Sequence, residues 1–125
     1  MKATIEQLAQ ILIFSDLESS ELERLQAYSQ VKQFQPAEIV MQEGDQLPAK
    51  LYALLNGSLR VTKTSAAGKE TILRTLLPGE IFAAPALLGN GIAPAAVTAE
   101  SDSEILTVDR NALLEAIQQK PEIAL

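Results

Sequence analysis

The chain has 125 residues, a formal net charge of −6, and neither histidine nor cysteine. Its length suits one domain with a buried core, and a composition of 47% hydrophobic and 21% charged residues is typical of a soluble globular protein. The missing residues exclude histidine-dependent catalytic triads, imidazole or thiolate metal sites and disulfides, and the negative charge disfavours nucleic acid and anionic membranes as partners.

No apolar run is long enough to span a membrane, and the N-terminus lacks the basic-then-apolar layout of a signal peptide. There is no internal repeat and no linker-like stretch. We therefore expect a single cytoplasmic domain over residues 1–125, with no membrane partner.

Two helices are expected in the N-terminal part, which ends at Pro36. The first lies within residues 3–13, where four apolar residues recur at helical spacing: Ile5, Leu8, Ala9 and Leu12. In the second, Ser20 is the predicted N-cap, and Glu23 three residues later completes a capping box. Leu22 and Leu25 form its predicted buried face.

Between about residues 29 and 108, short strand-like runs alternate with turn residues, which is typical of an all-β sandwich or barrel. Residues 58–62 alternate, with Leu59 and Val61 expected inward and the other three outward: Ser58, Arg60 and Thr62. Asn56-Gly57 predicts a hairpin, because both residues tolerate positive φ. The stretch AAGKE (66–70) lacks the glycine and hydroxyl residue of a phosphate-binding loop, so it is expected to be a hairpin tip.

The last part of the chain predicts two strands around an acidic turn, followed by a helix. Three acidic residues of this turn are far more typical of a solvated turn than of a cation site: Glu100, Asp102 and Glu104. Asp109 is a plausible N-cap for the helix, and its apolar face is expected to hold Leu113, Leu114 and Ile117. Pro121 ends that helix or opens another.

Three stretches together carry a resemblance to a known family: FSDLESSELERL (14–25), FQPAEIVMQEGDQLPAKLYALLNGSLRVTK (34–63), and LPGEIFAAPALLG with AAVTAESDSEILTVDR (77–110). Their order and spacing resemble the cyclic nucleotide-binding domain of the cyclic AMP receptor and oxygen-response regulator superfamily. The resemblance implies a mainly β fold, a double-stranded β-helix or jelly-roll-like β-roll with two N-terminal helices and a C-terminal helix. It also implies a non-catalytic regulatory or sensor domain of the transcription regulator family, with a small-molecule effector as its partner.

The segment that would bind the ligand departs from the family pattern. In the family, a second Gly-Glu follows the PGE turn and binds the ribose, and an Arg about ten residues later pairs with the cyclic phosphate. Here the Gly-Glu falls on Ala83 and Ala84, and the Arg falls on Ala93, or on Pro94 in a longer loop. Pro85 also removes a backbone N–H near the start of the short helix. The predicted degenerate pocket comprises Phe82, Ala83, Ala84, Pro85, Ala86, Ala93, Pro94 and Ala95.

Three interpretations follow from this departure. The segment keeps the family fold without its chemistry, so that cyclic AMP and cyclic GMP do not bind in the usual way. Alternatively, a different, apolar or anion-poor effector occupies the same place. A cupin-like enzyme on a similar β-roll would need metal-binding histidines, and there are none. We expect no metal, no cofactor and no enzymatic activity.

The family's regulators continue into a long dimerisation helix and a helix-turn-helix. This chain stops where that helix would begin, leaving only residues 121–125 of it. We therefore expect no DNA-binding domain in this chain, no binding of nucleic acid by the chain alone, and a monomer or weak homodimer.

Overall fold

The computed structural model describes residues 1–119, with the side chains of Leu12, Ile117 and Gln119 left out of the description. Within that range the chain forms eight strands and four α-helices, with a short 3₁₀ helix, η1, after the first. The helical elements are α1 (Ile5–Ala9), η1 (Leu12–Phe14), α2 (Ser19–Gln26), α3 (Ala84–Leu88) and α4 (Arg110–Gln119).

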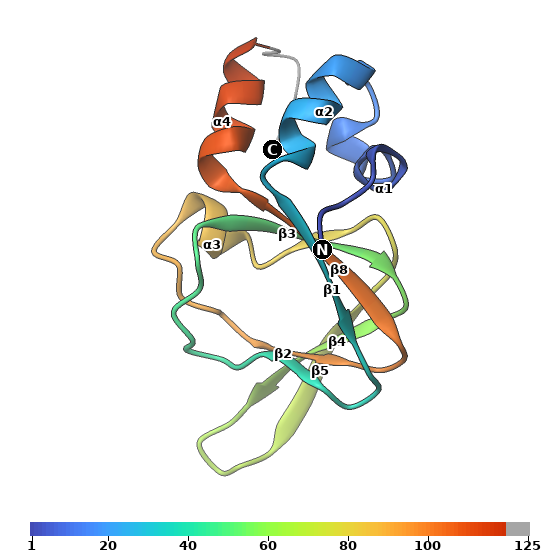
Figure 1. Ribbon diagram of the computed structural model, residues 1–125. Coiled ribbons are helices and arrows are strands. Elements are labelled where there is room, and N and C mark those ends of the chain that lie inside the picture. The colour runs from blue at the N-terminus through green and yellow to red at the C-terminus, as the bar shows by residue number, and fades with distance from the viewer. Residues whose placement is uncertain (120–125) are drawn as a thin grey trace.

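The strands pair into two antiparallel sheets. The first sheet has the order β1-β8-β3-β6 and the second has the order β2-β7-β4-β5. Their bounds are β1 (Ser29–Phe34), β2 (Ile39–Met41), β3 (Lys50–Asn56), β4 (Leu59–Thr64), β5 (Glu70–Leu76), β6 (Ile81–Phe82), β7 (Ala96–Ala99) and β8 (Ser103–Asp109). Every connection between consecutive strands except that from β4 to β5 carries the chain from one sheet to the other, which confirms the predicted mainly β, β-roll fold (Figure 1).

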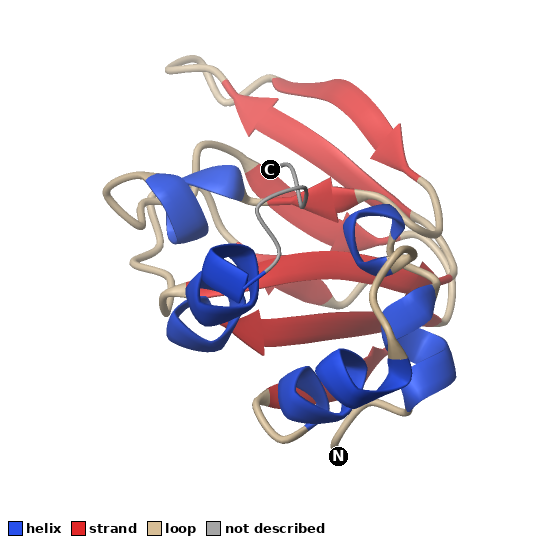
Figure 2. Cartoon of the chain, turned by 90° about the horizontal axis from the view of Figure 1, so that it is seen from above, coloured by secondary structure: helices blue, strands red, loops and turns tan. Residues whose placement is uncertain are grey.

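Two buried clusters lie on opposite faces of the first sheet. One joins that sheet to α1, α2 and α4, which lie together on its outer side in Figures 1 and 2. The other fills the space between the two sheets, and its buried members are Phe34, Met41, Leu54, Leu59, Leu76, Phe82, Ala93, Val97, Ala99 and Ile105. We call this second cluster the roll core.

The predicted first helix is two shorter helical pieces, α1 and η1, rather than one. Leu8 is fully buried and Ile5 half-buried as expected, but Ala9 is exposed, while the side chain of Leu12 lies outside the described residues. Because the helix breaks after Ala9, the 3.6-residue period ends there and Ile11 takes the buried position instead.

The capping box predicted for the second helix is wrong. α2 begins at Ser19, its N-cap is Glu18, and that residue makes no side-chain capping bond. A full capping box occurs instead at α1, where Thr4 and Gln7 each bond to the other's backbone. Leu22 and Leu25 are buried as predicted, because the helical spacing of the apolar residues does not depend on the cap.

The predicted Asn56-Gly57 hairpin is also wrong, because β3 and β4 belong to different sheets. The pair is instead a corner between the sheets, in which Gly57 has φ +93° and Asn56 has no positive φ. A Cβ atom on Gly57 would overlap the carbonyl oxygen of Asp102 and the side chain of Ser103. This corner therefore needs glycine both for its dihedral angle and for its close approach to the β7–β8 turn.

The hairpin tip at AAGKE is confirmed, since β4 and β5 are antiparallel neighbours. Their pairing runs from Leu59 opposite Leu76 to Thr64 opposite Glu70. Along β4, Leu59 is buried and Val61 half-buried, but Thr62 is only 3% exposed instead of facing outward into solvent. The pairing with β5 shifts by one residue between Val61 and Thr62. A bulge of this kind disturbs the strict alternation from which the outward position was predicted.

At the C-terminal end, β7 and β8 flank the acidic turn as predicted, and Asp109 ends β8 directly before α4. Leu113 is fully buried and Leu114 is half-buried. The side chain of Ile117 is not among those described, and Pro121 lies outside the described residues. Among residues 1–119, no helix is long and apolar enough to cross a membrane.

Candidate functional site

The degenerate pocket positions lie where β6 leads into α3 and where the chain returns toward β7. Phe82 ends β6, is 7% exposed, and pairs with Tyr52 of β3. The two rings lie with centroids 5.8 Å apart and an interplanar angle of 44°. Burial raises the pKa of Tyr52 above its ordinary value. The two aromatic rings therefore form one side of the site, and the pairing of β3 with β6 in the first sheet holds them in place.

Ala83 has a left-handed backbone, with φ +56° and ψ +45°. A residue with a Cβ atom in this region costs about 1–2 kcal/mol, and the conformation is routine only for glycine. Ala83 is the residue onto which the family resemblance places a glycine. The backbone thus adopts at this point the conformation that glycine would favour, although the side chain has changed.

The next three residues begin α3 and offer no charged or hydrogen-bonding side chain. Ala84 is exposed, Pro85 occupies the first turn of the helix, and Ala86 is 5% exposed. The carbonyl of Pro85 accepts from the N–H groups of Gly89 and Gly91, both at 3.0 Å. The short helix is therefore closed by its own backbone, and its side chains supply only apolar surface.

The returning segment is held by the loop between β2 and β3. The N–H of Ala93 donates to the carbonyl of Asp45 at 2.9 Å, and the carbonyl of Ala93 accepts from Gly44 at 2.9 Å. The N–H of Leu47 donates to the carbonyl of Gly91 at 2.7 Å. We call these contacts between 44–47 and 91–93 the loop clamp. They are all backbone bonds, so they fix the path of the segment whatever its side chains are.

Ala93 is 1% exposed and belongs to the roll core together with Phe82. Ala95 is 5% exposed, whereas Pro94 is exposed. The structure therefore brings Phe82, Ala83 and Ala93 to one apolar cluster and leaves Ala84 and Pro94 on its outer side. Nothing among these side chains can bind an anion.

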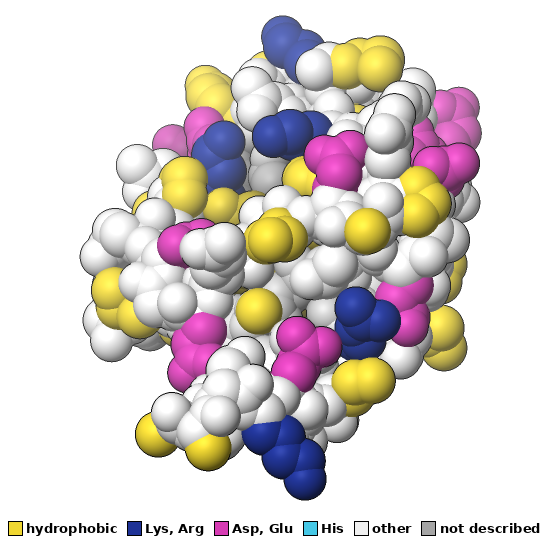
Figure 3. All heavy atoms as spheres, turned by 90° about the horizontal axis from the view of Figure 1, so that it is seen from below, with side chains coloured by type: hydrophobic (Ala, Val, Ile, Leu, Met, Phe, Trp, Pro, Cys, Tyr) yellow, Lys and Arg dark blue, Asp and Glu magenta, His cyan; other side chains and the backbone are white. Residues whose placement is uncertain are grey.

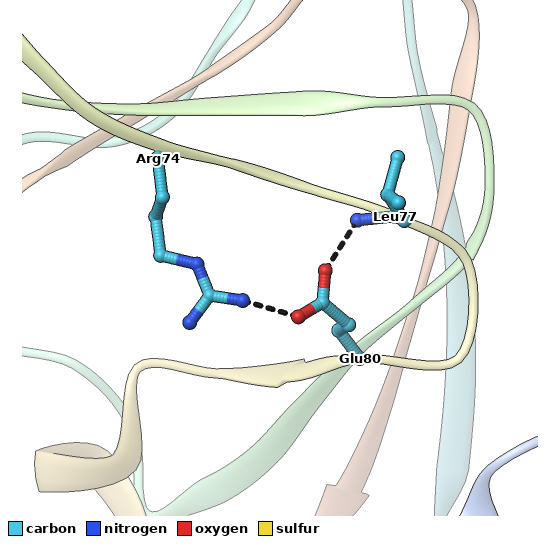
Figure 4. A network of polar contacts seen from close by, with 3 residues as sticks. All are labelled: Arg74, Leu77 and Glu80. Carbon is cyan, nitrogen blue, oxygen red and sulfur yellow. Dashed lines mark hydrogen bonds and ion pairs between the residues drawn. The ribbon is translucent and has the colours of Figure 1, made fainter.

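One charged pair beside this site was not foreseen from the sequence. Arg74 donates through Nη2 to Oε1 of Glu80, whose Oε2 accepts from the N–H of Leu77 at 2.7 Å (Figure 4). Arg74 pairs in register with Val61 and stands two residues before the buried Leu76, so its side chain starts from the inner face of β5. That two-residue spacing is the sequence signal that could have placed it there.

Glu80 thus pairs with Arg74, which is the one basic residue of β5. The ion pair is partly exposed, with 54% of the Arg74 side chain and 36% of the Glu80 side chain accessible. It ties the end of β5 to the turn before β6, which is a structural role. Both carboxylate oxygens of Glu80 therefore already accept a hydrogen bond, one from Arg74 and one from the N–H of Leu77.

The acidic turn is not gathered around a common point in the described residues, where no group of three or more potential metal-ligating side chains occurs. Glu104 instead accepts from Nδ2 of Asn56 at 2.6 Å. On the molecular face in Figure 3, lysine and arginine side chains stand singly among aspartate and glutamate, without a continuous basic patch.

Comparison with known proteins shows what this arrangement resembles. Residues 31–120 match the family model of the cyclic nucleotide-binding domain. The chain is 30% identical over 112 residues to the cyclic AMP receptor protein of Thermus thermophilus, covering 90% of this chain and 51% of that protein. It is 26% identical over 118 residues to a CRP-like cAMP-activated global transcriptional regulator of Mycobacterium tuberculosis, covering 94% and 52%.

Among solved structures, the Thermus thermophilus catabolite activator protein superimposes with a TM-score of 0.74 at 29% identity, over 87% of this chain and 51% of that one. The chain thus spans about half the length of the curated relatives that it matches.

Proposed function

The chain belongs to the cyclic nucleotide-binding domain family, and from that premise we propose that it is a regulatory domain that does not bind cyclic AMP or cyclic GMP through the family's usual contacts. The regulatory character is that of its relatives, which include transcription regulators. The restriction on the ligand is a property of this chain's own residues.

The observation that carries the proposal is the backbone of Ala83. Its left-handed conformation supports the placement of the family's glycine at this residue, and therefore of the family's Glu at Ala84 and its Arg at Ala93. With that register, two charge-assisted hydrogen bonds to the ligand are missing. Each is worth roughly 1.5–3 kcal/mol, so affinity should fall by about two to four decades.

Burial adds to this loss. Ala93 is 1% exposed in the roll core, so a cyclic phosphate next to it would give up hydration without gaining a charged partner. The nearest cation on β5, Arg74, is already bound to Glu80. Both observations favour a domain whose regulatory input, if it is a small molecule at this place, is apolar or poor in anionic groups.

Calorimetric titration with cyclic AMP and cyclic GMP tests the proposal. The wild-type chain should show no binding below about 1 mM, whereas the triple change Ala83→Gly, Ala84→Glu, Ala93→Arg should recover part of the affinity. Because Ala93 is buried, a second version places the arginine at the exposed Pro94 instead (Pro94→Arg).

The matched control adds the same two charges at the hairpin tip, Ala66→Glu with Ala67→Arg, where both alanines are exposed. This variant should not bind. Micromolar binding by the wild-type chain contradicts the proposal. A folded triple variant and a folded Pro94→Arg version that both fail to bind would contradict the residue assignment, while the family membership would stand.

We further propose that the chain alone is a single sensor domain that is monomeric or weakly dimeric and has no nucleic-acid partner. The net charge of −6 and the lack of a continuous basic patch on the face in Figure 3 support the point on nucleic acid. Sedimentation equilibrium that revealed a submicromolar dimer would contradict the first point.

A further inference from the structure

A hollow lies on the inner face of the first sheet, and it meets the segment 82–95 through Tyr52, whose ring lies against Phe82. It has a volume of about 400 Å³, and no residue of the segment 82–95 lines it. It is lined by residues of β1, β3 and β8, by Val40 of β2 and by Met1. This volume is within the range of small-molecule sites in proteins.

Three polar side chains form a row across the floor of this hollow. Gln30 of β1 pairs in register with Thr107 of β8, which pairs with Tyr52 of β3. The three side chains therefore stand side by side on adjacent strands and on one face. None of them makes a hydrogen bond to another residue in the part of the chain that the structure describes. The row presents an amide and two hydroxyls that are ready to bond a ligand.

An apolar patch lies beside this row. Phe34 and Ile105 are 9% and 2% exposed and belong to the roll core, and the half-buried Val40 packs against the same core. Together with Tyr52, these side chains give the hollow one apolar side and one polar side. A ligand that fits must therefore be amphipathic.

The charge facing the hollow is positive at one corner. Lys32 stands on the same face of β1 as Gln30, and its Nζ lies 5.3 Å from the centroid of the Phe34 ring. No carboxylate among residues 1–119 forms an ion pair with it. Lys50 lies at the opposite corner, but Asp109 is its partner in register on β8. Neither lysine forms an ion pair within residues 1–119, but Lys32 has the apolar Ile105 as its register partner instead of an acidic residue. Lys32 is therefore the cation beside the apolar patch that is placed to bind an anionic group.

From this arrangement we infer that the hollow binds a small organic acid with an apolar body. Its carboxylate pairs with Lys32, its body lies on Phe34, Val40 and Ile105, and its remaining polar atoms bond to the row of Gln30, Thr107 and Tyr52. The inference does not rest on the proposed function, because no residue of the segment 82–95 lines the hollow, although Tyr52 of the hollow contacts Phe82 of that segment.

The test uses 3-phenylpropionate as the probe and 3-phenylpropylamine, which has the same body with a cationic end, as its counterpart. Titration of the isotope-labelled chain is followed by ¹H–¹⁵N correlation spectra. The acid should shift the amides of residues 30–34 and 105–107 with a dissociation constant below about 5 mM, while the amine should bind at least tenfold more weakly.

Two lysine variants separate the charge from the fold. Lys32→Gln should weaken binding of the acid about tenfold, because a charge-assisted contact is lost. Lys69→Gln, at the exposed tip of the β4–β5 hairpin, should leave it unchanged. The inference is overturned if the acid causes no shift at a concentration ten times the expected dissociation constant, or if the shifts centre on residues 82–95. It is also overturned if the amine binds as tightly as the acid, or if the two lysine variants bind the acid equally well.

Discussion

The left-handed backbone of Ala83 gives a prediction that tests the register of the whole segment. Replacing Ala83 by glycine removes a Cβ atom from a conformation that costs about 1–2 kcal/mol. Against this, glycine loses more conformational freedom on folding, which costs roughly 0.5–1 kcal/mol. The half-buried methyl group, which packs against the roll core, accounts for a few tenths more. Ala83→Gly should therefore change the free energy of unfolding by close to 0 kcal/mol, within about 0.5 kcal/mol either way.

The matched control is Ala27→Gly. Ala27 is exposed and right-handed, with φ −62° and ψ −24°, so its replacement brings the entropic cost without any relief of strain. This variant should lose about 1 kcal/mol. Urea unfolding followed by circular dichroism measures both, and a difference of 1 kcal/mol corresponds to roughly 0.3–1 M in midpoint at an unchanged m-value. Equal destabilisation by the two changes would refute the left-handed assignment and the register built on it.

Three further predictions follow from other parts of the molecule. Gly57→Ala should lower the free energy of unfolding by about 2 kcal/mol or more, because it combines a positive φ with overlap against the β7–β8 turn. Gly68 has φ +84° and open space around it, so Gly68→Ala should lose only the free energy due to the positive φ. Equal losses in the two variants would contradict the close approach at Gly57. Since burial raises the pKa of Tyr52 above 10.0, the folded state favours the neutral phenol, so stability should fall as the pH rises above about 10; Tyr52→Phe should remove the late phase of an absorbance titration. In a mobility-shift titration at low salt, the chain alone should not retain DNA selectively, and saturable retention at micromolar protein would contradict the expectation drawn from its charge.

The regular spacing of apolar residues was sufficient to predict an all-β sandwich or barrel between helices, and the family resemblance was needed to predict the β-roll. Leu22, Leu25, Leu59 and Leu113 are buried as that spacing predicts. The order of elements and the turn at AAGKE also follow from local patterns alone.

Local patterns failed where the outcome depends on which strand lies next to which. Asn56-Gly57 has the chemistry of a hairpin turn, and only the pairing of β3 with β6 and β8 shows that it is a corner. The burial of Thr62 depends on a register shift against β5, and the ion pair of Arg74 with Glu80 depends on the fold of the turn between them. In the candidate site, the residue types were evident from the sequence, whereas the left-handed backbone at Ala83 was not.

The loop clamp has a consequence for how this segment evolves and for how it can be engineered. Its bonds join the backbone of residues 44–47 to that of residues 91–93, so they survive any substitution that keeps an N–H at Gly44, Leu47 and Ala93. Exposed positions such as Ala84 and Pro94 can then exchange side chains freely without releasing the path of the chain. Because the backbone path is fixed in this way, substitutions at these positions can remove an inherited ligand specificity while the protein stays folded. A new specificity can be selected from a library of variants at the same positions.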